Sequence, residues 1–539
     1  MVKTAAQVSP AKLRGGFYSP PGLVRLCLDR IMQLSGGRDS LRILEPSAGD
    51  GAFIRGVAGH PLRDQLGELI AVELVPAEAG QCARTMAERR VAGRVETGSF
   101  LRHRVGLAGE FDVAVGNPPF LRFQFVEPAD RIGAEVLTRD LGTKLHGVSN
   151  LWIPIFLGAL STLRDGGSFA FIVPAECLTG TSGRIVRNWL IEHGQELRID
   201  LFPVGSFPGV LQEVLILSGR IRHEAHGDGK IEVHDHASAE VWRQLADESA
   251  STWTGLLLRP EQLDAVCYAR SLPGVLPLGR IAKLNVATVT GANEFFAFDD
   301  ERRQRFQLQR WTRPLLARTR QAPGLVFTAA DFERNLAGGL PSWLLDANLP
   351  GEDVTSTGSG ARYVASGEQR GLPDGYKCRI RQPWYQVPVV KPGTLMLSKR
   401  SHRYPRLIRN EAGVVSTDTI YQGCVLAEHA GREADVVGSF HNSLTMLSAE
   451  LYGRSFGGGV LELVPSEVSA LLLPLARIGG HGLARLDTLV RAIGHDDEAL
   501  IVATDALLTT VLPQLDLELM ASLRAGRAVL LNRRLARAC

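Results

Sequence analysis

Residues 111–120 read FDVAVGNPPF, a short apolar run that ends in two consecutive prolines. The run predicts a buried strand that stops at Asn117, because neither Pro118 nor Pro119 has an N–H to donate to a sheet. The prolines fix the local backbone, so the Asn117 amide and the carbonyls beside it point outward in a set geometry. Phe120 adds a flat apolar face. This pattern suits a planar ring that carries an amino group, but a proline-rich turn closing a core strand would look the same.

The flanking sequence predicts strands alternating with helices over the first 220 residues. Strand-like runs occur at 41–46 (LRILEP), 69–74 (LIAVEL), 168–174 (SFAFIVP), 197–202 (LRIDLF) and 213–219 (EVLILSG), and helical spacing at 23–34 and 151–163. Such alternation predicts an α/β fold with a doubly wound, mostly parallel sheet. Sheets of this kind bind ligands at the carboxyl ends of their strands.

A glycine turn and two acidic residues lie at such strand ends. The turn EPSAGDGAF (45–53) contains Gly49 and Gly51, which permit a tight bend and close approach of a ligand. It matches neither a dinucleotide nor a phosphate loop. Glu45 would repel a pyrophosphate and favour a ligand with an ammonium or sulfonium charge. Glu73 closes the second run, where an acidic residue commonly accepts both hydroxyls of a ribose. An ordinary turn and a solvated carboxylate are the alternatives.

The composition is that of a soluble globular protein of two or three domains, with 539 residues, 45% hydrophobic and 22% charged. No apolar run is long enough to cross a bilayer, and the N-terminus lacks the apolar core of a signal peptide. The seven cysteines are scattered without a CxxC pair, which favours a reduced, cytoplasmic setting without a zinc site. With a net charge of +3, any nucleic-acid surface must be a local patch.

The ordered set GGFYSPP, ILEPSAGDGAFI, AVEL, GSFL, GNPPF, SNLWIPIFLGAL…GGSFAFIVPAECL and SFPGVLQEVLIL resembles the N6-adenine DNA methyltransferases of restriction–modification systems. The resemblance covers about residues 14–220 and is to the group with the cofactor half first, the catalytic half second and target recognition last. It implies a seven-stranded, Rossmann-like class I methyltransferase domain, S-adenosylmethionine as cofactor and double-stranded DNA as substrate. It also implies that a separate restriction endonuclease cleaves unmodified DNA, since no nuclease triad is evident.

The resemblance assigns cofactor contacts residue by residue. Ser19 and Pro20 would flank the cofactor, and Glu45 with the turn at Ala48, Gly49 and Gly51 would hold its methionine end. Glu73 would hold the ribose and Phe100 would pack near the adenine, with Asn117 at the reacting end. The family usually has Asp before that Phe, bonding the adenine amino group. Here the residue is Ser99, which puts that contact in doubt.

The chemistry of the tetrapeptide follows from its residue types. The Asn117 side-chain oxygen and the Pro118 carbonyl can each accept one N–H of an adenine amine, which localises the nitrogen lone pair, while Pro119 keeps both acceptors rigid. The base must be flipped out of the duplex at a cost of a few kcal/mol. Phe120 would stack on it. The resemblance adds Phe207 as a second stacking aromatic and Asn150 as a pocket residue, although Phe207 could be an ordinary core side chain.

The sequence suggests four regions: a methyltransferase domain at 1–220, a linker at 221–250, an α+β target-recognition domain at 251–480 and a helical segment at 481–539. The linker is polar and contains His223, His226, His234 and His236. Their spacing fits no standard metal site, so we expect no metal.

The stretch 377–410 contains nine Lys or Arg residues and no acidic one, interleaved with Trp384, Tyr385 and Tyr404. In a nearly neutral chain this is a plausible footprint for DNA phosphate, with a solvated basic surface as the alternative. The candidate DNA-binding residues are Lys377, Arg379, Arg381, Lys399, Arg400, Arg403, Arg406 and Arg409. The arginines at 524, 527, 533, 534 and 537 are further candidates for phosphate, or belong to a solvated helix face.

Two other functions remain open at this point. A methyltransferase acting on protein glutamine or RNA also uses Asn-Pro-Pro, although such enzymes tend to be smaller and lack a long basic region. A non-catalytic DNA-binding relative would keep the fold, but the intact residues 117–120 and the glycine turn argue against it.

Overall fold

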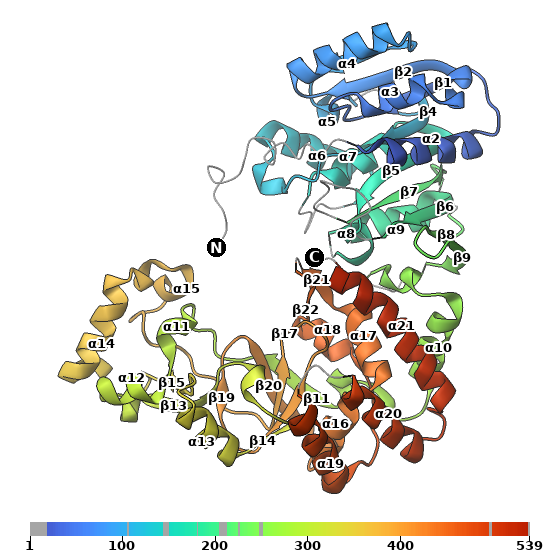
Figure 1. The fold of residues 1–539 in the computed structure, drawn as a ribbon. Coiled ribbons are helices and arrows are strands. Elements are labelled where there is room, and N and C mark those ends of the chain that lie inside the picture. Colours follow the sequence, from blue (N-terminus) through green and yellow to red (C-terminus); the bar gives the residue numbers. More distant parts are fainter. Residues whose placement is uncertain are drawn as a thin grey trace. The chain divides into compact units, whose positions relative to one another are not determined.

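The computed structural model describes residues 19–104, 107–143, 150–180, 182–203, 213–224, 227–246, 252–456, 458–494 and 498–536 (Figure 1). The chain folds as two compact units, unit 1 (Met1–Pro260) and unit 2 (Glu261–Cys539). None of the described helices combines the length and the apolar composition needed to span a bilayer.

Unit 1 is built on a nine-stranded sheet with the order β3-β2-β1-β4-β5-β7-β6-β8-β9. Its strands are β1 (Leu41–Glu45), β2 (Leu66–Glu73), β3 (Gly93–Thr97), β4 (Phe111–Gly116), β5 (Leu163–Pro174), β6 (Gly194–Leu201), β7 (Val214–Ile221), β8 (Lys230–Asp235) and β9 (Glu240–Leu245). Strands β3, β2, β1, β4 and β5 pair in parallel in that order. Strand β7 is antiparallel to both of its neighbours, and β8 and β9 form an antiparallel pair at one edge.

The α-helices of unit 1 form two groups: α3 contacts both α2 and α4, and α5, α6 and α7 contact one another. Their bounds are α2 (Pro21–Ser35), α3 (Ala52–Ala58), α4 (Pro76–Glu88), α5 (Phe100–His103), α6 (Pro128–Asp140), α7 (Trp152–Ser161), α8 (Glu176–Thr179) and α9 (Arg184–His193). The predicted α/β class with a doubly wound, mostly parallel sheet is confirmed, but the sheet has nine strands where seven were expected.

The two additional strands lie where a linker was expected. Residues 230–245 form β8 and β9, and β8 pairs in parallel with β6. Ile231 and Val233 alternate with charged residues and are fully buried. The charged positions made this half-buried strand look like a polar linker in the sequence. Strand β3 was also not predicted, because it is a short edge strand with charged, partly exposed side chains.

Unit 2 combines short strands with helices, which confirms the expected α+β architecture of the C-terminal region. A five-stranded sheet has the order β11-β20-β16-β18-β14, and a four-stranded sheet the order β12-β15-β13-β19. The strands are β10 (Val275–Pro277), β11 (Ala282–Val286), β12 (Ala297–Phe298), β13 (Thr312–Leu316), β14 (Val326–Phe327), β15 (Trp343–Leu345), β16 (Leu395–Ser398), β17 (Arg400–Ser401), β18 (Leu407–Asn410), β19 (Val415–Ser416), β20 (Ile420–Val425), β21 (Arg454–Phe456), β22 (Val460–Glu462) and β23 (Leu472–Pro474).

The α-helices from the start of unit 2 to the C-terminus are α10 (Pro260–Ser271), α11 (Asn293–Phe296), α12 (Asp300–Arg305), α13 (Ala329–Ala337), α14 (Gly358–Gln369), α15 (Tyr376–Arg379), α16 (Glu433–Phe440), α17 (Ser443–Tyr452), α18 (Pro465–Ala470), α19 (Gly479–Ile493), α20 (Ala499–Val511) and α21 (Leu517–Ala536). The last helix packs on α17, and Arg534 forms a buried ion pair with Glu450 at 2.6 Å. The helical segment expected as a separate tail therefore belongs to the body of unit 2.

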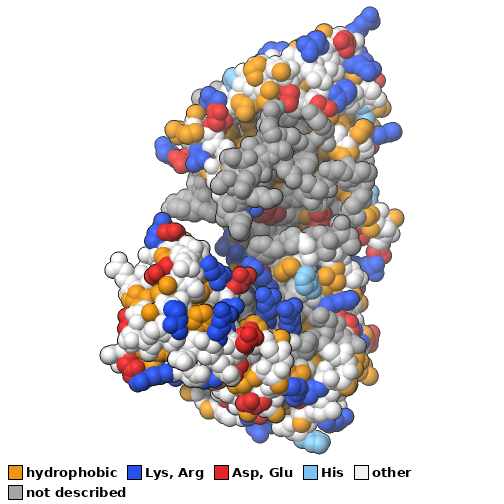
Figure 2. All heavy atoms as spheres, turned by 60° about the vertical axis from the view of Figure 1, so that its left-hand side comes forward, with side chains coloured by type: hydrophobic (Ala, Val, Ile, Leu, Met, Phe, Trp, Pro, Cys, Tyr) orange, Lys and Arg blue, Asp and Glu red, His pale blue; other side chains and the backbone are white. Residues whose placement is uncertain are grey.

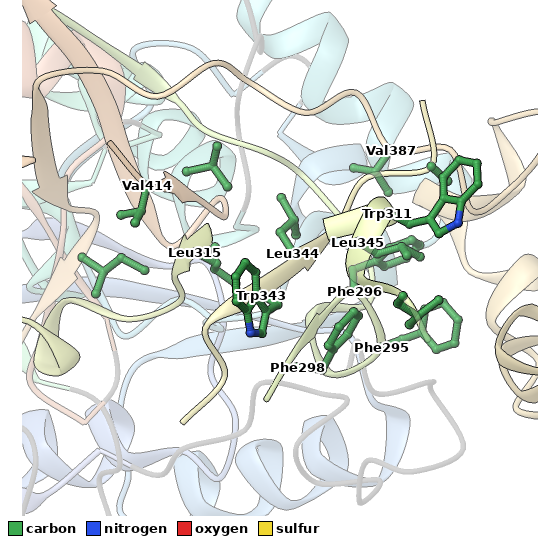
Figure 3. Close-up of a cluster of buried hydrophobic side chains, with 14 of the residues drawn as sticks. Phe295, Phe296, Phe298, Trp311, Leu315, Trp343, Leu344, Leu345, Val387 and Val414 are labelled. Carbon is green, nitrogen blue, oxygen red and sulfur yellow. The ribbon is translucent and has the colours of Figure 1, made fainter. Parts of the chain in front are cut away.

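An aromatic-rich core fills one part of unit 2. Figure 3 shows Phe295, Phe296, Phe298, Trp311 and Trp343 gathered with aliphatic side chains. The aromatic residues 384 and 385 of the basic stretch belong to the same buried cluster. Their side chains hold the fold together and are not surface plates for bases.

Candidate active site

A cavity of about 400 Å³ lies in unit 1 at the carboxyl ends of β1, β2 and β4. Residues from the glycine turn, from the end of β2, from the turn after β3 and from the Asn-Pro-Pro segment line it together with α6 and α7. Nine of the predicted site residues are in this lining: Ser19, Glu45, Ala48, Gly49, Glu73, Ser99, Phe100, Asn117 and Pro119. Four strand ends that are far apart in sequence thus meet at one edge, as a parallel sheet requires.

The glycine turn has the backbone that its sequence predicts. Gly49 and Gly51 have φ angles of 55° and 78°, in the left-handed region that favours glycine. A backbone hydrogen bond from Ala48 N to Val72 O (2.9 Å) ties the turn to the neighbouring strand β2. A side chain at Gly49 would meet no atom within 4 Å, so its surface faces open space in the cavity.

Glu73, at the end of β2, is bonded to the glycine turn. One carboxylate oxygen accepts a hydrogen bond from Gly49 N and the other from Val75 N, both at 2.8 Å. Burial raises the pKa of Glu73, and the two backbone N–H groups oppose that rise. Each oxygen retains acceptor capacity, so the carboxylate can still receive a pair of hydroxyls.

Glu45 is buried in the cavity wall, 1% exposed, and its Oε2 accepts no hydrogen bond from the described residues. Burial raises the pKa of Glu45 well above its ordinary value, with Asp50 and Glu73 adding repulsion and Arg55 opposing it. The neighbouring Ser47 Oγ is also buried without a partner among the described residues. Unsatisfied buried acceptors in a cavity fit a ligand that brings N–H donors, such as an ammonium group.

Asn117 has a defined orientation at the end of β4. Its Nδ2 donates to Ser19 Oγ at 3.1 Å, across 98 residues of sequence. Gly116 precedes it, and a side chain there would come within 3.2 Å of the Phe171 ring and 3.3 Å of Pro46. The glycine therefore lets the strand end close against its neighbours. Hydrogen bonds from Leu121 N to Pro119 O (3.0 Å) and from Leu151 N to Leu121 O (2.8 Å) fix the segment beyond it.

The remaining predicted residues of the catalytic half have other surroundings. Phe120 is half-buried and packs against the core of unit 1. Asn150 is buried, and its Oδ1 accepts from Trp152 N at 3.4 Å, at the start of α7. Pro20, Gly51, Pro118, Phe120 and Asn150 are not among the residues that line the cavity. Phe207 lies outside the described residues.

Two features of the site have no signal in the sequence. The Ser19–Asn117 hydrogen bond joins positions whose proximity only the fold creates. Asp130, in the first turn of α6, lines the cavity and is 6% exposed, although it belongs to no recognisable motif.

The histidines at 234 and 236 pair with Glu232 and Asp200. In the described part of the chain, no group of three or more His, Cys, Asp or Glu side chains could hold a metal ion.

The basic stretch of unit 2 separates into anchored and exposed residues. Arg406 is 5% exposed, and its guanidinium donates to the carbonyls of Thr319, Ala322 and Gly324 at 2.7–3.2 Å. Arg381 donates to the carbonyls of Thr290 and Val289. Arg406 therefore braces the backbone, and its predicted contact with DNA stays an untested prediction that its burial disfavours.

Tyr404, the last aromatic of the stretch, is 2% exposed and belongs to a core cluster. Lys377, Arg379 and Arg403 are exposed. The remaining predicted DNA-binding residues have acidic neighbours: Lys399 and Arg400 lie near Glu462, and Arg409 near Glu411. Figure 2 shows Lys and Arg side chains gathered on the drawn face of unit 2.

The C-terminal arginines are also partly internal. Arg527 and Arg534 are each 2% exposed and pair with Glu498 and Glu450. Arg524 pairs with the buried Asp505. Arg527 and Arg534 are used inside unit 2, so neither the phosphate-binding nor the solvated-face interpretation describes them, whereas Arg524 is partly exposed. Residue 537 lies outside the described range.

The sheet order and the cavity at its carboxyl edge are those of the class I methyltransferase fold. Comparison with protein families places the chain more closely. The family model described as Eco57I restriction-modification methylase matches residues 83–205, and the model for the C-terminal domain of the type II methyltransferase M.Eco57I matches residues 250–508. The chain belongs to the Eco57I family of type II restriction–modification DNA methyltransferases.

Two curated relatives and a solved structure resemble different shares of the chain. It is 24% identical to the type II methyltransferase M.AccI of Acinetobacter calcoaceticus over 379 residues, covering 67% of this chain and 68% of that one. It is 28% identical to M.TthHB8I of Thermus thermophilus over 257 residues, covering 46% of this chain and 53% of the relative. The type IIL restriction–modification enzyme MmeI, solved in complex with DNA, is 12% identical with a TM-score of 0.50, over 96% of this chain and 74% of that one, which shows similarity of fold.

Proposed function

We propose that this protein transfers the methyl group of S-adenosylmethionine to the N6 amino group of an adenine in double-stranded DNA at a specific site. The observation that carries the proposal is that Asn117 lines the same cavity as the buried, incompletely satisfied Glu45. This cavity favours an ammonium group and hydroxyls, and Asn117 in its lining is followed directly by the Pro118 carbonyl. An aromatic amine bound by these two acceptors would therefore lie close to a methyl donor in the cavity.

The order of the cavity residues along the sheet edge matches the order of the chemical groups in the proposed cofactor. Strands β4, β1, β2 and β3 are neighbours in that order, and each contributes a residue at its carboxyl end. Glu45 after β1 would hold the ammonium group, Glu73 after β2 the ribose hydroxyls, and Phe100 after β3 would pack on the adenine. The bound cofactor would supply an electrophilic methyl group on its sulfonium.

The protein's own task is to prepare the amine. An adenine amine is a weak nucleophile because its lone pair is delocalised into the ring. The hydrogen bond from Asn117 Nδ2 to Ser19 Oγ orients the amide so that its Oδ1 is the acceptor side. With the Pro118 carbonyl as a second acceptor, both amine hydrogens are bound and the nitrogen moves toward tetrahedral geometry, which stabilises its developing positive charge. After the nitrogen gains the methyl group, it releases one proton to solvent.

The target base has to leave the duplex to reach Asn117. Extrusion costs a few kcal/mol, and stacking on an aromatic ring returns roughly 1–3 kcal/mol per base. Phe120 is the described residue best placed for stacking, because it follows the acceptors directly and is half-buried against the core. The exposed residues Lys377, Arg379 and Arg403 are our candidates for phosphate contacts in unit 2.

A transfer assay tests the reaction. The protein is incubated with S-adenosylmethionine labelled in the methyl group and with duplex DNA, RNA or a protein mixture in separate arms. We expect label only in the DNA, recovered as N6-methyladenine after digestion to nucleosides. Label in protein or RNA instead of DNA would overturn the proposal, as would methylated cytosine.

Asn117→Ala tests the mechanism. Loss of a positioned acceptor should lower the single-turnover methylation rate by at least 10²–10³-fold, while DNA and cofactor dissociation constants change little. Ser19→Ala removes only the partner that orients the amide, so its rate should fall less. A normal rate in Asn117→Ala at unchanged DNA occupancy contradicts the proposed role.

The biological role follows from the family. We propose that methylation protects the cell's DNA against a partner restriction endonuclease. DNA from cells that express the protein should resist cleavage at a subset of restriction sites, and DNA from cells that express Asn117→Ala should be cut. Resistance in both would point to an effect other than methylation.

A further inference from the structure

One end of the cavity is lined mainly by apolar side chains, with a buried carboxylate among them. Phe100, Leu101, Val126 and Ile155 form its walls, and Asp130 lies among them, 6% exposed. A carboxylate in such surroundings is costly unless it is paired or bound to donors. Asp130 forms an ion pair with Arg102, and its carboxylate retains acceptor capacity for a ligand group that brings N–H donors.

The fold holds Asp130 firmly beside the turn that follows β3. Its Oδ1 is 3.1 Å from Arg102 Nε but accepts no hydrogen bond from the described residues. Helix α6 contacts α5 closely, since a side chain at Gly133 would come within 3.2 Å of Leu101. Asp130 and Ser99 thus line the same part of the cavity.

The position along the sheet edge indicates which part of the cofactor arrives there. Glu73 is level with Thr97 of β3 in the parallel pairing of β2 and β3. If Glu73 holds the ribose, the base extends toward the end of β3, between Phe100 and Asp130. Ser99 offers a hydroxyl at this point, whereas Asp130 offers an acceptor-only group when ionised.

We propose that Asp130 accepts a hydrogen bond from the exocyclic amine of the cofactor's adenine, and so selects a 6-amino purine over purines without that amine. This inference rests on the proposed use of S-adenosylmethionine. It makes Asp130 a cofactor-binding residue supplied by α6, in place of a carboxylate at position 99.

Binding of two nucleosides tests this without requiring turnover. Titration calorimetry on the full chain would compare S-adenosylhomocysteine with its 6-desamino analogue, which differs only in the exocyclic amine. The wild type should bind S-adenosylhomocysteine about tenfold more tightly, the effect of one hydrogen bond to a charged acceptor. Asp130→Ala should lose this preference, binding S-adenosylhomocysteine about tenfold more weakly and the analogue as before.

Three further variants separate recognition from local structure. Glu135→Ala removes an exposed carboxylate from the same helix and should retain the preference. Arg102→Ala removes the ion pair with Asp130 and should also retain it, so loss in both variants would indicate disturbed packing and overturn the inference. Ser99→Asp in the Asp130→Ala background should restore the preference by placing a carboxylate on the neighbouring turn.

The outcomes also separate this inference from the proposed function. A wild type that binds neither nucleoside, and transfers no methyl group, contradicts the use of S-adenosylmethionine. A wild type that binds S-adenosylhomocysteine, together with an Asp130→Ala variant whose tenfold preference is intact, leaves the proposed function standing and overturns the role of Asp130 alone.

Discussion

Glu45 shows how a single buried carboxylate can prepare a cavity for a cation. Its Oε2 accepts nothing from the described residues, and burial raises its pKa well above the ordinary value. The neutral form is therefore favoured more strongly than in an exposed carboxyl group. A bound ammonium group would favour the ionised form of Glu45, so the carboxyl group would release its proton on binding. Binding and deprotonation of Glu45 are therefore linked.

This linkage predicts a pH-dependent affinity. Below the raised pKa of Glu45 the carboxyl is neutral in the free protein, and binding of S-adenosylhomocysteine must release a proton. Affinity should therefore increase with pH through that pKa and then level off. Calorimetry between pH 5.5 and 8.5, in buffers of different ionisation enthalpy, measures the proton release.

Methylthioadenosine provides the control, because it lacks the amino-acid end and its affinity should not show this rise. Glu45→Gln should flatten the profile for S-adenosylhomocysteine. The folding stability of the free protein should change with pH in the opposite direction. Because the pKa of Glu45 is raised in the folded state, its contribution to stability is fully present below the unfolded value of 4.5 and is lost as pH rises through the folded pKa. Equal pH profiles for both nucleosides would contradict the assignment to Glu45.

At the scale of single residues, the sequence predicted the positions of those site residues that directly follow a strand. Asn117, Glu73 and Gly49 follow strand runs directly, so their place at the sheet edge could be inferred from spacing, and all three line the cavity. Asp130 and the Ser19 hydroxyl could not be inferred, because their place depends on how a helix packs and how a distant segment returns.

At the scale of elements, the glycine turn is a backbone conformation with a testable cost. Gly49→Ala adds a methyl group in open space but forces a left-handed residue, which should destabilise the fold by roughly 1–2 kcal/mol and weaken cofactor binding. Gly22→Ala is matched to it: the methyl group also meets no atom within 4 Å, but the residue lies in α2 with an ordinary φ. That variant should be stabilised by roughly 0.5–1 kcal/mol.

Urea denaturation of both variants measures the difference. Two shifts of the same sign and size would show that the methyl groups, and not the backbone angle, determine the effect. A Gly49→Ala variant with wild-type cofactor affinity would show that the turn need not hold its left-handed residue for the cavity to form.

The strands show where pattern-based prediction works. Strands β1, β2 and β4 are rich in apolar residues, because parallel strands buried on both faces disfavour charge. Strand β7 is antiparallel to its neighbours but is buried along most of its length, and its apolar run was recognised for that reason. Strands β3 and β8 lie at or near an edge and carry charge on one face, so their sequences resemble loops. The resemblance to the catalytic half ended near residue 220 and gave no guidance beyond it.

At the scale of the whole molecule, the residues of the basic stretch fall into an exposed group and a buried group, for which we expect different roles. Lys377 and Arg379 are exposed, and each phosphate contact should contribute about 0.9 to the slope of log affinity against log salt concentration. Replacing either residue by Ala should therefore reduce that slope by roughly 1. Fluorescence anisotropy with duplex DNA at 50–200 mM salt measures it.

Arg406→Ala is the contrasting variant. It removes a donor from three backbone carbonyls, of which Thr319 O still accepts from Ala322 N. The free energy of unfolding should fall by roughly 1–3 kcal/mol for each carbonyl left unsatisfied. Its salt slope should stay near the wild-type value at temperatures where the protein is folded. A reduced slope in a fully stable Arg406→Ala variant would return this residue to the DNA surface.

The separation of anchored from exposed positions has a consequence for engineering. Trp384, Tyr404 and Arg406 hold unit 2 together, while Lys377 and Arg379 protrude from the same stretch. A combinatorial library could therefore randomise the protruding positions and leave the internal ones unchanged. Most of its members would remain folded, so selection for altered target sequences would act on recognition and not on survival of the scaffold.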